Sequence, residues 1–141
     1  MSMEIIANAI QTVAANQNVY FTDTVTCGNC SISHRSGSGL VTLRGMTTQC
    51  RARFKVSFGG NIGLPATGTA GAISLAISID GEAIQSTTMT ETPAAVSEFS
   101  NVFSSIFIDV PSGCCVTISV QNISTQAVDV QNANLIVERV A

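Results

Sequence analysis

Five cysteines are the residues of this 141-residue chain whose type and spacing are best suited to chemistry. Cys27 and Cys30 form a Cys-x-x-Cys motif, Cys50 follows alone, and Cys114 and Cys115 are adjacent. A structural zinc site takes four ligands, commonly from two paired motifs of this kind. The second paired motif is absent, and we therefore predict no metal site.

The expected course of the chain divides these cysteines between two ends. If the strands alternate in direction, Cys27 and Cys30 lie at one end, and Cys50 lies with Cys114 at the other. Two disulfides are then conceivable, Cys27 with Cys30 and Cys50 with Cys114 or Cys115. Adjacent residues of a strand point to opposite faces, so at most one of Cys114 and Cys115 faces the core. The alternative is that all five are reduced thiols packed as small hydrophobic groups, and the sequence leaves both readings open.

Catalytic motifs are missing from the rest of the sequence. His34 is the only histidine, and no Gly-x-Ser-x-Gly motif accompanies it. Asp80 and Glu82 flank Gly81 and resemble hairpin residues, because no third carboxylate nearby completes a calcium site. A redox Cys-x-x-Cys needs a helix N-terminus that this pattern does not offer. We predict no catalytic residue and no cofactor, hence a protein that is not an enzyme.

Strands are the elements that must position these residues, and residues 51–58 show the clearest strand pattern. Four apolar residues alternate there with four polar ones, and this period of two places them on opposite faces of a strand. The polar face carries half of the six basic residues of the chain. Gly59, Gly60 and Asn61 favour positive φ angles and are predicted to end the strand in a turn. The apolar residues are Ala52, Phe54, Val56 and Phe58, and the polar ones are Arg51, Arg53, Lys55 and Ser57.

Strand patterns recur between turn signals over the rest of the chain, and no helical period is sustained. About eight to ten strands are expected, which favours a sandwich or jelly roll. Residues 36–39 are predicted to be a bend within one strand course, and Asp80-Gly81 a hairpin turn. Residues 1–12 are predicted to be an irregular N-terminal arm, with 4–15 readable as a short helix or an edge strand. The other expected strands are 18–25, 32–34, 40–43, 72–79, 82–89, 99–110, 114–121 and 132–140.

Composition restricts the partners. Charged residues make up 11% of the chain, less than half the usual share, which favours an oligomer whose surface is covered by other copies over a neutral monomer. A net charge of −3 argues against nucleic-acid binding. The chain has no apolar run of about 18 residues for membrane insertion, and residues 1–6 lack the pattern of a secretory signal.

Four short sequences, in this order, resemble the tumour necrosis factor (TNF) and complement globular-head superfamily. They are Gly-Ser-Gly-x-Val-Thr-Leu from residue 37, Arg-x-Lys-Val-Ser-Phe-Gly-Gly-Asn-Ile from residue 53, Ser-Leu-Ala-Ile-Ser-Ile-Asp-Gly from residue 74, and Asn-Ala-Asn-Leu-Ile-Val-Glu-Arg-Val from residue 132. The similarity runs from about residue 13 to the end of the chain. It is greatest to small stand-alone bacterial and bacteriophage members of gut Firmicutes.

The resemblance implies a single domain over residues 1–141, an all-β, two-sheet antiparallel jelly roll of about ten strands that assembles as a compact homotrimer. It also places residues 51–58 between the last strand and strand 99–110. We therefore expect Arg51, Arg53 and Lys55 to face Asp109 and Glu138 across the sheet, in a charge ladder or trimer interface. Consecutive apolar residues around Ile136 and Tyr20 suggest strands covered on both faces. The alternative for the basic residues is a solvated stripe.

Function is predicted from this resemblance and from the lack of a catalytic set. The leading expectation is a structural or binding module encoded by a phage or prophage, acting with virion proteins or at an extracellular surface. The alternatives are a secreted or surface-displayed ligand that engages a host receptor, and a carbohydrate-binding head. The last is disfavoured because the chain has one Tyr and no Trp for stacking on sugars. Fold alone does not decide among them.

Overall fold

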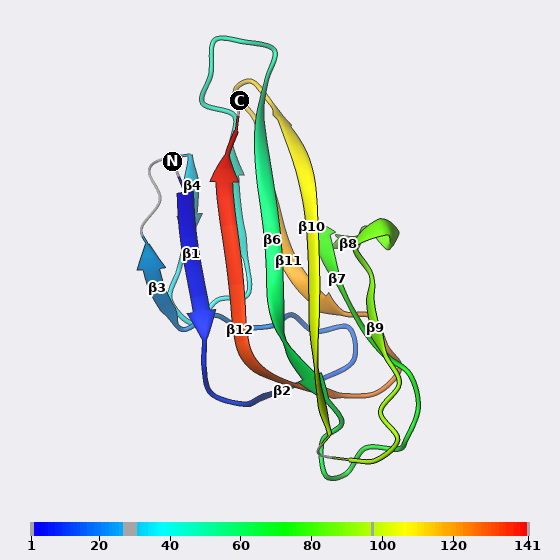
Figure 1. Cartoon of the computed structure of the whole chain (residues 1–141). Helices are drawn as coiled ribbons and strands as arrows, with labels where there is room; N and C mark the ends of the chain where they lie inside the picture. The colour runs from blue at the N-terminus through cyan, green and yellow to red at the C-terminus, as the bar shows by residue number, and fades with distance from the viewer. Residues whose placement is uncertain (1, 27–30, 97, 141) are drawn as a thin grey trace.

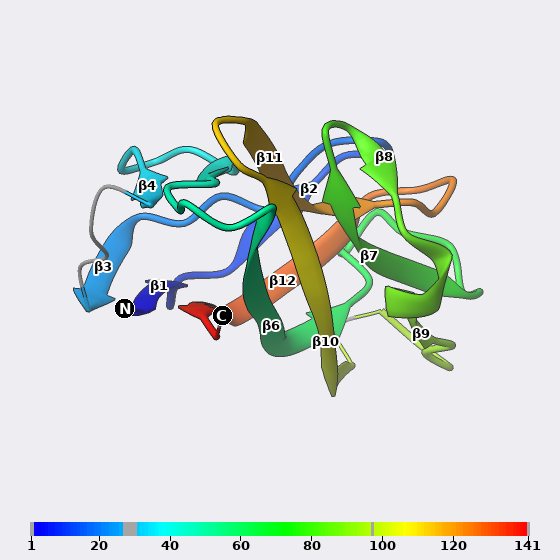
Figure 2. The same ribbon diagram turned by 90° about the horizontal axis from the view of Figure 1, so that it is seen from above.

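A computed structural model describes residues 2–26, 31–96 and 98–140 of the chain. Its strands form two antiparallel sheets that face each other as two layers (Figures 1 and 2). Sheet A has the order β10-β6-β12-β1-β3, with β2 paired to β12. Its strands are β1 (Ser2–Ala7), β2 (Gln11–Val13), β3 (Asp23–Thr26), β6 (Arg51–Gly63), β10 (Phe99–Pro111) and β12 (Val128–Arg139).

Sheet B has the order β4-β5-β11-β7-β8, with β9 paired to β7. One short 3-10 helix, η1 (Gln85–Thr87), lies between β8 and β9. Every ladder between the described strands is antiparallel. The strands of sheet B are β4 (Ile32–His34), β5 (Val41–Arg44), β7 (Ile73–Ile79), β8 (Glu82–Ala83), β9 (Met89–Glu91) and β11 (Cys115–Asn122).

The core lies between the two sheets and takes one side chain in two from the long strands. Phe54, Val56 and Phe58 of β6 are fully buried, as their alternation predicts. Phe58 packs edge-to-face on Phe21, with ring centroids 6.3 Å apart. Sheet B contributes Ile73, Leu75 and Ile77 of β7, Leu43 of β5, and Ile118 and Val120 of β11. The sequence thus correctly predicts an all-β fold of two antiparallel sheets.

Glycines 59 and 60 do not end β6, contrary to the turn predicted from the sequence. The strand runs on through both glycines and Asn61 to Gly63, and all of this stretch pairs with β10. The irregularity lies instead in the neighbouring strand β12, where the register shifts between Gln131 and Asn134 and Asn132 adopts a φ of 54°. Such a bulge bends one strand while its partner stays extended.

Two further expectations about local structure are wrong. Residues 2–7 form β1, an inner strand of sheet A between β12 and β3, where an irregular arm, helix or edge strand was expected. Residues 36–39 connect two antiparallel strands, since Ile32 pairs with Leu43, so they form a hairpin loop and not a bend. The Asp80-Gly81 hairpin turn is confirmed, with φ angles of 52° and 86°.

The first and last strands are neighbours and run in opposite directions. Ser2 at the start of β1 lies opposite Glu138 near the end of β12. Figure 1 shows the two ends of the chain close together at one end of the sandwich. The loops 45–50 and 111–114 lie at this same end, where the backbone N–H of Gly113 donates to the carbonyl of Gly45 at 3.0 Å.

Candidate functional site

The outer face of sheet A, formed by the side chains that alternate with the core residues, is the candidate site. Antiparallel pairing arranges its residues in rows across β10, β6 and β12. Adjacent rows are two residues apart along β10 and β6, the first row lacks a residue of β12, and the bulge in β12 separates its last two rows by three residues. From one end of β6 to the other, the rows are Asp109–Arg53, Phe107–Lys55–Glu138, Ser105–Ser57–Ile136, Phe103–Gly59–Asn134 and Asn101–Asn61–Gln131.

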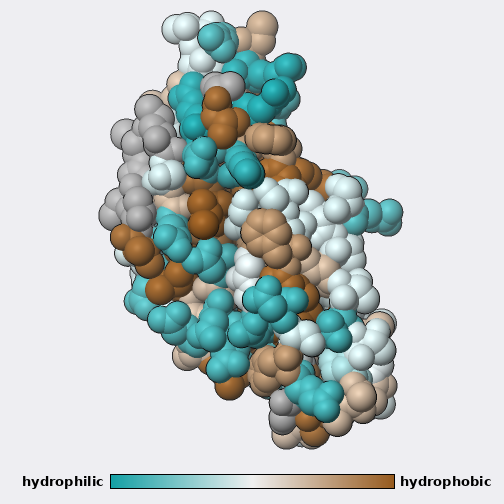
Figure 3. Space-filling view, in the orientation of Figure 1, coloured by the Kyte–Doolittle hydropathy of each residue, from teal (hydrophilic) through white to brown (hydrophobic). Residues whose placement is uncertain are grey.

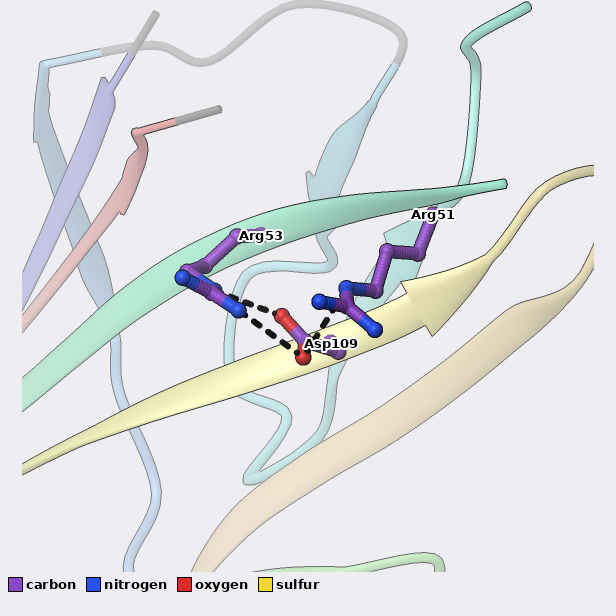
Figure 4. A network of polar contacts seen from close by, with 3 residues as sticks. All are labelled: Arg51, Arg53 and Asp109. Carbon is purple, nitrogen blue, oxygen red and sulfur yellow. Dashed lines mark hydrogen bonds and ion pairs between the residues drawn. The ribbon is translucent and has the colours of Figure 1, made fainter. Parts of the chain in front are cut away.

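Asp109 joins two arginines at one end of this face (Figure 4). The Nε of Arg53 donates to Oδ1 of Asp109 at 2.8 Å, and Nη2 of Arg53 donates to Oδ2 at 3.3 Å. The Nε of Arg51 lies 3.3 Å from the same Oδ2. Hydrogen bonding from Arg53, together with the charges of both arginines, lowers the pKa of Asp109. The structure thus places two of the three basic residues against one of the two predicted acids.

The other two members of the predicted charge ladder are Lys55 and Glu138. Lys55 and Glu138 lie opposite each other in register, yet neither forms an ion pair with any residue that the structure describes. Both side chains are exposed. Water stabilises each of two exposed charges about as well as an opposite charge does, so facing positions in the sheet are not enough to form an ion pair. The structure therefore places Lys55 opposite Glu138, as expected, but without a salt bridge between them within one chain.

Large apolar side chains are also exposed on this face. Phe103 is 66% exposed and Phe107 is 61% exposed, both on β10, and Ile136 of β12 is 39% exposed. The apolar side chains lie among polar ones over β12, β6 and β10 in Figure 3, which has the orientation of Figure 1. The core is filled without them, since it is formed by the alternate residues of the same strands. These three side chains therefore make a surface that the described part of the chain does not cover.

A hollow of about 330 Å³ opens in the middle of the face. Gly59 and Gly60 form its floor, and Phe103, Asn134 and Ile136 stand around it. Polar side chains at the rim are paired with one another: Asn101 donates to Asn61 at 3.2 Å, and Asn134 donates to Glu4. The lining carries no charged side chain, so the hollow favours a neutral group.

Tyr20 lies apart from this face, in the segment between β2 and β3. It is 51% exposed, whereas the adjacent Phe21 is fully buried. The side-chain amide of Gln11 bonds both backbone groups of Tyr20, accepting from its N–H and donating to its carbonyl, each at 2.8 Å. The prediction of a strand over residues 18–25 is thus only partly right, because β3 begins at Asp23.

The cysteines of the described residues are free. Cys50, Cys114 and Cys115 are exposed thiols, so of the two readings left open by the sequence, these three follow the reduced one, with no disulfide between Cys50 and Cys114 or Cys115. The ladder between β6 and β10 continues beyond Arg51, and the N–H of Ser112 donates to the carbonyl of Cys50 at 3.0 Å. This pairing places Cys50 opposite Ser112, while Cys115 belongs to sheet B. Cys27 and Cys30, the other expected pair, lie outside the described residues.

His34 borders a second hollow, of about 300 Å³, on sheet B. Its Nε2 lies 2.8 Å from the carbonyl of Ser38, which can only accept. Its Nδ1 is buried without a partner, and the ring packs edge-to-face on Phe21. Over residues 2–26, 31–96 and 98–140 no three His, Cys, Asp or Glu side chains gather as metal ligands. No helix in these ranges is long and apolar enough to span a membrane.

Sequence reasoning missed the two phenylalanines of β10 and the hollow beside them. The signal was present, since Phe103, Phe107 and Asp109 share one parity and Val102, Ile108 and Val110 share the other. Residues 99–110 are apolar on both parities, which predicts a strand but not which face is buried. The hollow has no signal in the sequence, because glycines within a strand look like glycines in a turn.

Comparisons with known proteins bear on the fold. No family model matches the sequence, and no curated protein matches it. Solved structures do match: the globular domain of zebrafish complement 1qA (TM-score 0.70, 10% identity, 99% of this chain and 97% of that one), murine APRIL (0.65, 10%, 97% of each), and Eiger TNF from S. frugiperda (0.71, 12%, 100% and 92%). The chain therefore has the two-sheet jelly-roll fold of complement globular heads and TNF-like domains.

Proposed function

We propose that residues 1–141 form one non-enzymatic domain that assembles as a homotrimer through the outer face of sheet A and acts as a TNF-like ligand, engaging a receptor at an extracellular surface. The observation that carries the proposal is the exposure of Phe103, Phe107 and Ile136 on a sheet face that the core does not need. Exposed apolar groups that cluster on one face mark interaction surfaces.

The edge of sheet A supports the same assignment. β10 is 13 residues long and pairs with β6 on one side only. A long edge strand with exposed phenylalanines invites uncontrolled pairing unless another element covers it. A partner that covers β10 and the face beside it removes this liability, and the low content of charged residues suits a surface of which part is buried.

A ring of three copies fits this face better than a twofold dimer. The two exposed phenylalanines lie toward one side of the face, on β10, and the hollow lies beside them toward β12, where Ile136 lines it. A head-to-tail contact joins two different patches, and it closes into a ring of three when the rotation between neighbouring copies is a third of a full turn. The likeness to complement 1qA, APRIL and Eiger TNF supports a binding role. No observation on the described residues favours a virion role or a carbohydrate-binding head over it.

Light scattering on the purified protein at micromolar concentration tests the assembly. We expect a solution mass of three times the 14.6 kDa chain. A mass equal to one chain would overturn the trimer. The ligand role is tested by saturable binding of the labelled protein to cells, with and without protease treatment of the cell surface. Loss of binding after protease treatment supports a receptor protein. Binding that resists protease but is abolished by glycosidases would mean that the receptor is a glycan.

A further inference from the structure

The hollow on sheet A is lined by Gly59, the one residue of its row without a side chain. Every position around Gly59 on the outer face carries a side chain: Phe103 and Asn134 lie in its own row, and Ser57 and Asn61 lie in the rows on either side. A Cβ built on Gly59 would meet Phe103 Cδ2 at 3.6 Å, an ordinary contact. Packing within the chain therefore does not require glycine here.

Backbone conformation does not require it either. Gly59 lies inside a regular strand and is not among the residues with positive φ. A glycine within a strand costs stability and often marks a place where another group approaches closely. Neither of these two reasons accounts for Gly59, and a glycine at this position leaves room for the close approach of another group.

Phe103 stands at the rim of this hollow and is 66% exposed, the most exposed of the large apolar side chains in the described residues. Because the Phe103 ring lines the side of the hollow, it does not fill the space over Gly59 in its own chain. The same face thus carries an apolar projection and a neutral recess of about 330 Å³ next to each other in one row. An aromatic ring is a suitable occupant, because such rings bury large apolar area with few rotatable bonds.

We infer that the hollow over Gly59 receives the Phe103 ring of a neighbouring copy of this chain, an inference that rests on the proposed trimer. As part of this inference we place the threefold axis parallel to the strands, so that rotation moves a residue around the axis but not along it. Phe103 of one copy then meets the same row of the next copy, and Gly59 is the residue of that row without a side chain. The ring packs between Asn134 and Ile136 of the receiving copy.

Charge complementarity points to a second copy as the occupant. The row of Phe107 carries one unpaired cation, Lys55, and one unpaired anion, Glu138, on neighbouring strands. When two copies of this row meet side by side, Lys55 of one lies toward Glu138 of the other. A strongly acidic or basic partner would match only one of these charges, whereas a copy of the chain matches both.

Truncation of Phe103 tests the inference. In Phe103→Ala we expect the concentration of half-dissociation to rise at least about tenfold, as for a central interface aromatic. Phe107→Ala is the matched control, since it removes the same side chain from the same strand two rows away, and we expect a smaller rise. Sedimentation velocity over a dilution series measures both, and far-UV circular dichroism verifies that the fold is retained.

Filling the hollow is the second arm. Gly59→Leu places an outward side chain in a strand and leaves the core untouched, so the variant should fold and lose assembly as Phe103→Ala does. The inference is wrong if both variants remain trimeric like the wild type, and also if Phe107→Ala dissociates as readily as Phe103→Ala. A monomeric wild type would instead refute the proposed trimer itself, so the two failures are distinguishable.

Discussion

At the residue scale, Asp109 accepts hydrogen bonds from Arg53 and also pairs with Arg51. These contacts lower its pKa in the folded chain, where the hydrogen bond from Arg53 has the largest effect. A carboxyl group with a lowered folded-state pKa stabilises the fold above its unfolded value, near 3.8, and this contribution disappears as pH falls through the folded value.

Asp109→Asn should therefore lower the melting temperature slightly at pH 7, by less than about 2 °C, because the group is solvent-exposed. The difference between variant and wild type should disappear as pH falls through the lowered pKa of Asp109, because the side chain is then neutral in both, and it should shrink in 1 M salt. Thermal melts followed by circular dichroism measure this. Glu82→Gln, at an exposed carboxylate of sheet B, is the control, and an equal effect there at pH 7 would mean that general charge, not the Asp109 contacts, is responsible.

The alternation of buried and exposed side chains along a strand could be predicted from the sequence, but the pairs that form across the sheet could not. The buried series Ala52 to Phe58 follows from a period of two. The pairing of Arg53 with Asp109 needed the register of β6 against β10, which came from a resemblance and not from the residues. Register was also correct for Lys55 and Glu138, but two long exposed side chains gain too little to hold one geometry.

At the scale of elements, Gly45 and Gly60 differ in whether the surrounding packing requires a glycine. A Cβ on Gly45 would lie 2.1 Å from the carbonyl oxygen of Pro111, because two loops touch there through their backbones. A Cβ on Gly60 would have its nearest contact at 3.4 Å, which is within ordinary packing. Gly45 is therefore needed for the approach of two loops, whereas Gly60 is not needed for packing.

We expect Gly45→Ala to lower the free energy of unfolding by about 1–3 kcal/mol or more, as an overpacked site does. Gly60→Ala should change it by less than about 1 kcal/mol. Urea denaturation followed by circular dichroism, at one protein concentration for all variants, gives both values. Equal losses for the two variants would show that the contact between Gly45 and Pro111 does not constrain the loops.

The sequence alone does not distinguish a glycine that a close backbone contact requires from one that lies within a strand. Gly-Gly-Asn is a strong turn signal from propensity alone, and only the bulge in β12 shows why β6 continues through it. Likewise, Ser2–Ala7 is too short for its period to decide between helix and strand, and its two neighbours in the sheet settle the matter. The Asp80-Gly81 turn was predictable because both residues adopt positive φ angles that few others tolerate.

At the scale of the whole molecule, the number of strand patterns and the spacing of turns sufficed for an all-β fold of two sheets. The identity of the face that stays uncovered did not follow, because it depends on which sheet each strand joins. Assembly would bury that face, and a folded trimer is stabilised by mass action relative to unfolded chains.

The melting temperature should therefore rise with protein concentration, by about 3 °C for each tenfold increase. Phe103→Ala should weaken this dependence over the range where it dissociates. Differential scanning calorimetry across two decades of concentration measures it. A melting temperature that does not change with concentration would contradict a trimer that unfolds and dissociates together.

The antiparallel contact between β1 and β12 has a consequence for how the chain can be reconnected. Because Ser2 lies opposite Glu138, a short flexible linker can join the two ends of the fold without crossing either sheet. New ends can then open after Gly81, in the exposed turn that joins β7 to β8, which leaves the two hydrogen bonds between Asp80 and Thr117 of β11 in place. Such a circular permutant keeps every ladder of both sheets and moves the points of attachment to the far layer, leaving the outer face of sheet A free of fused segments.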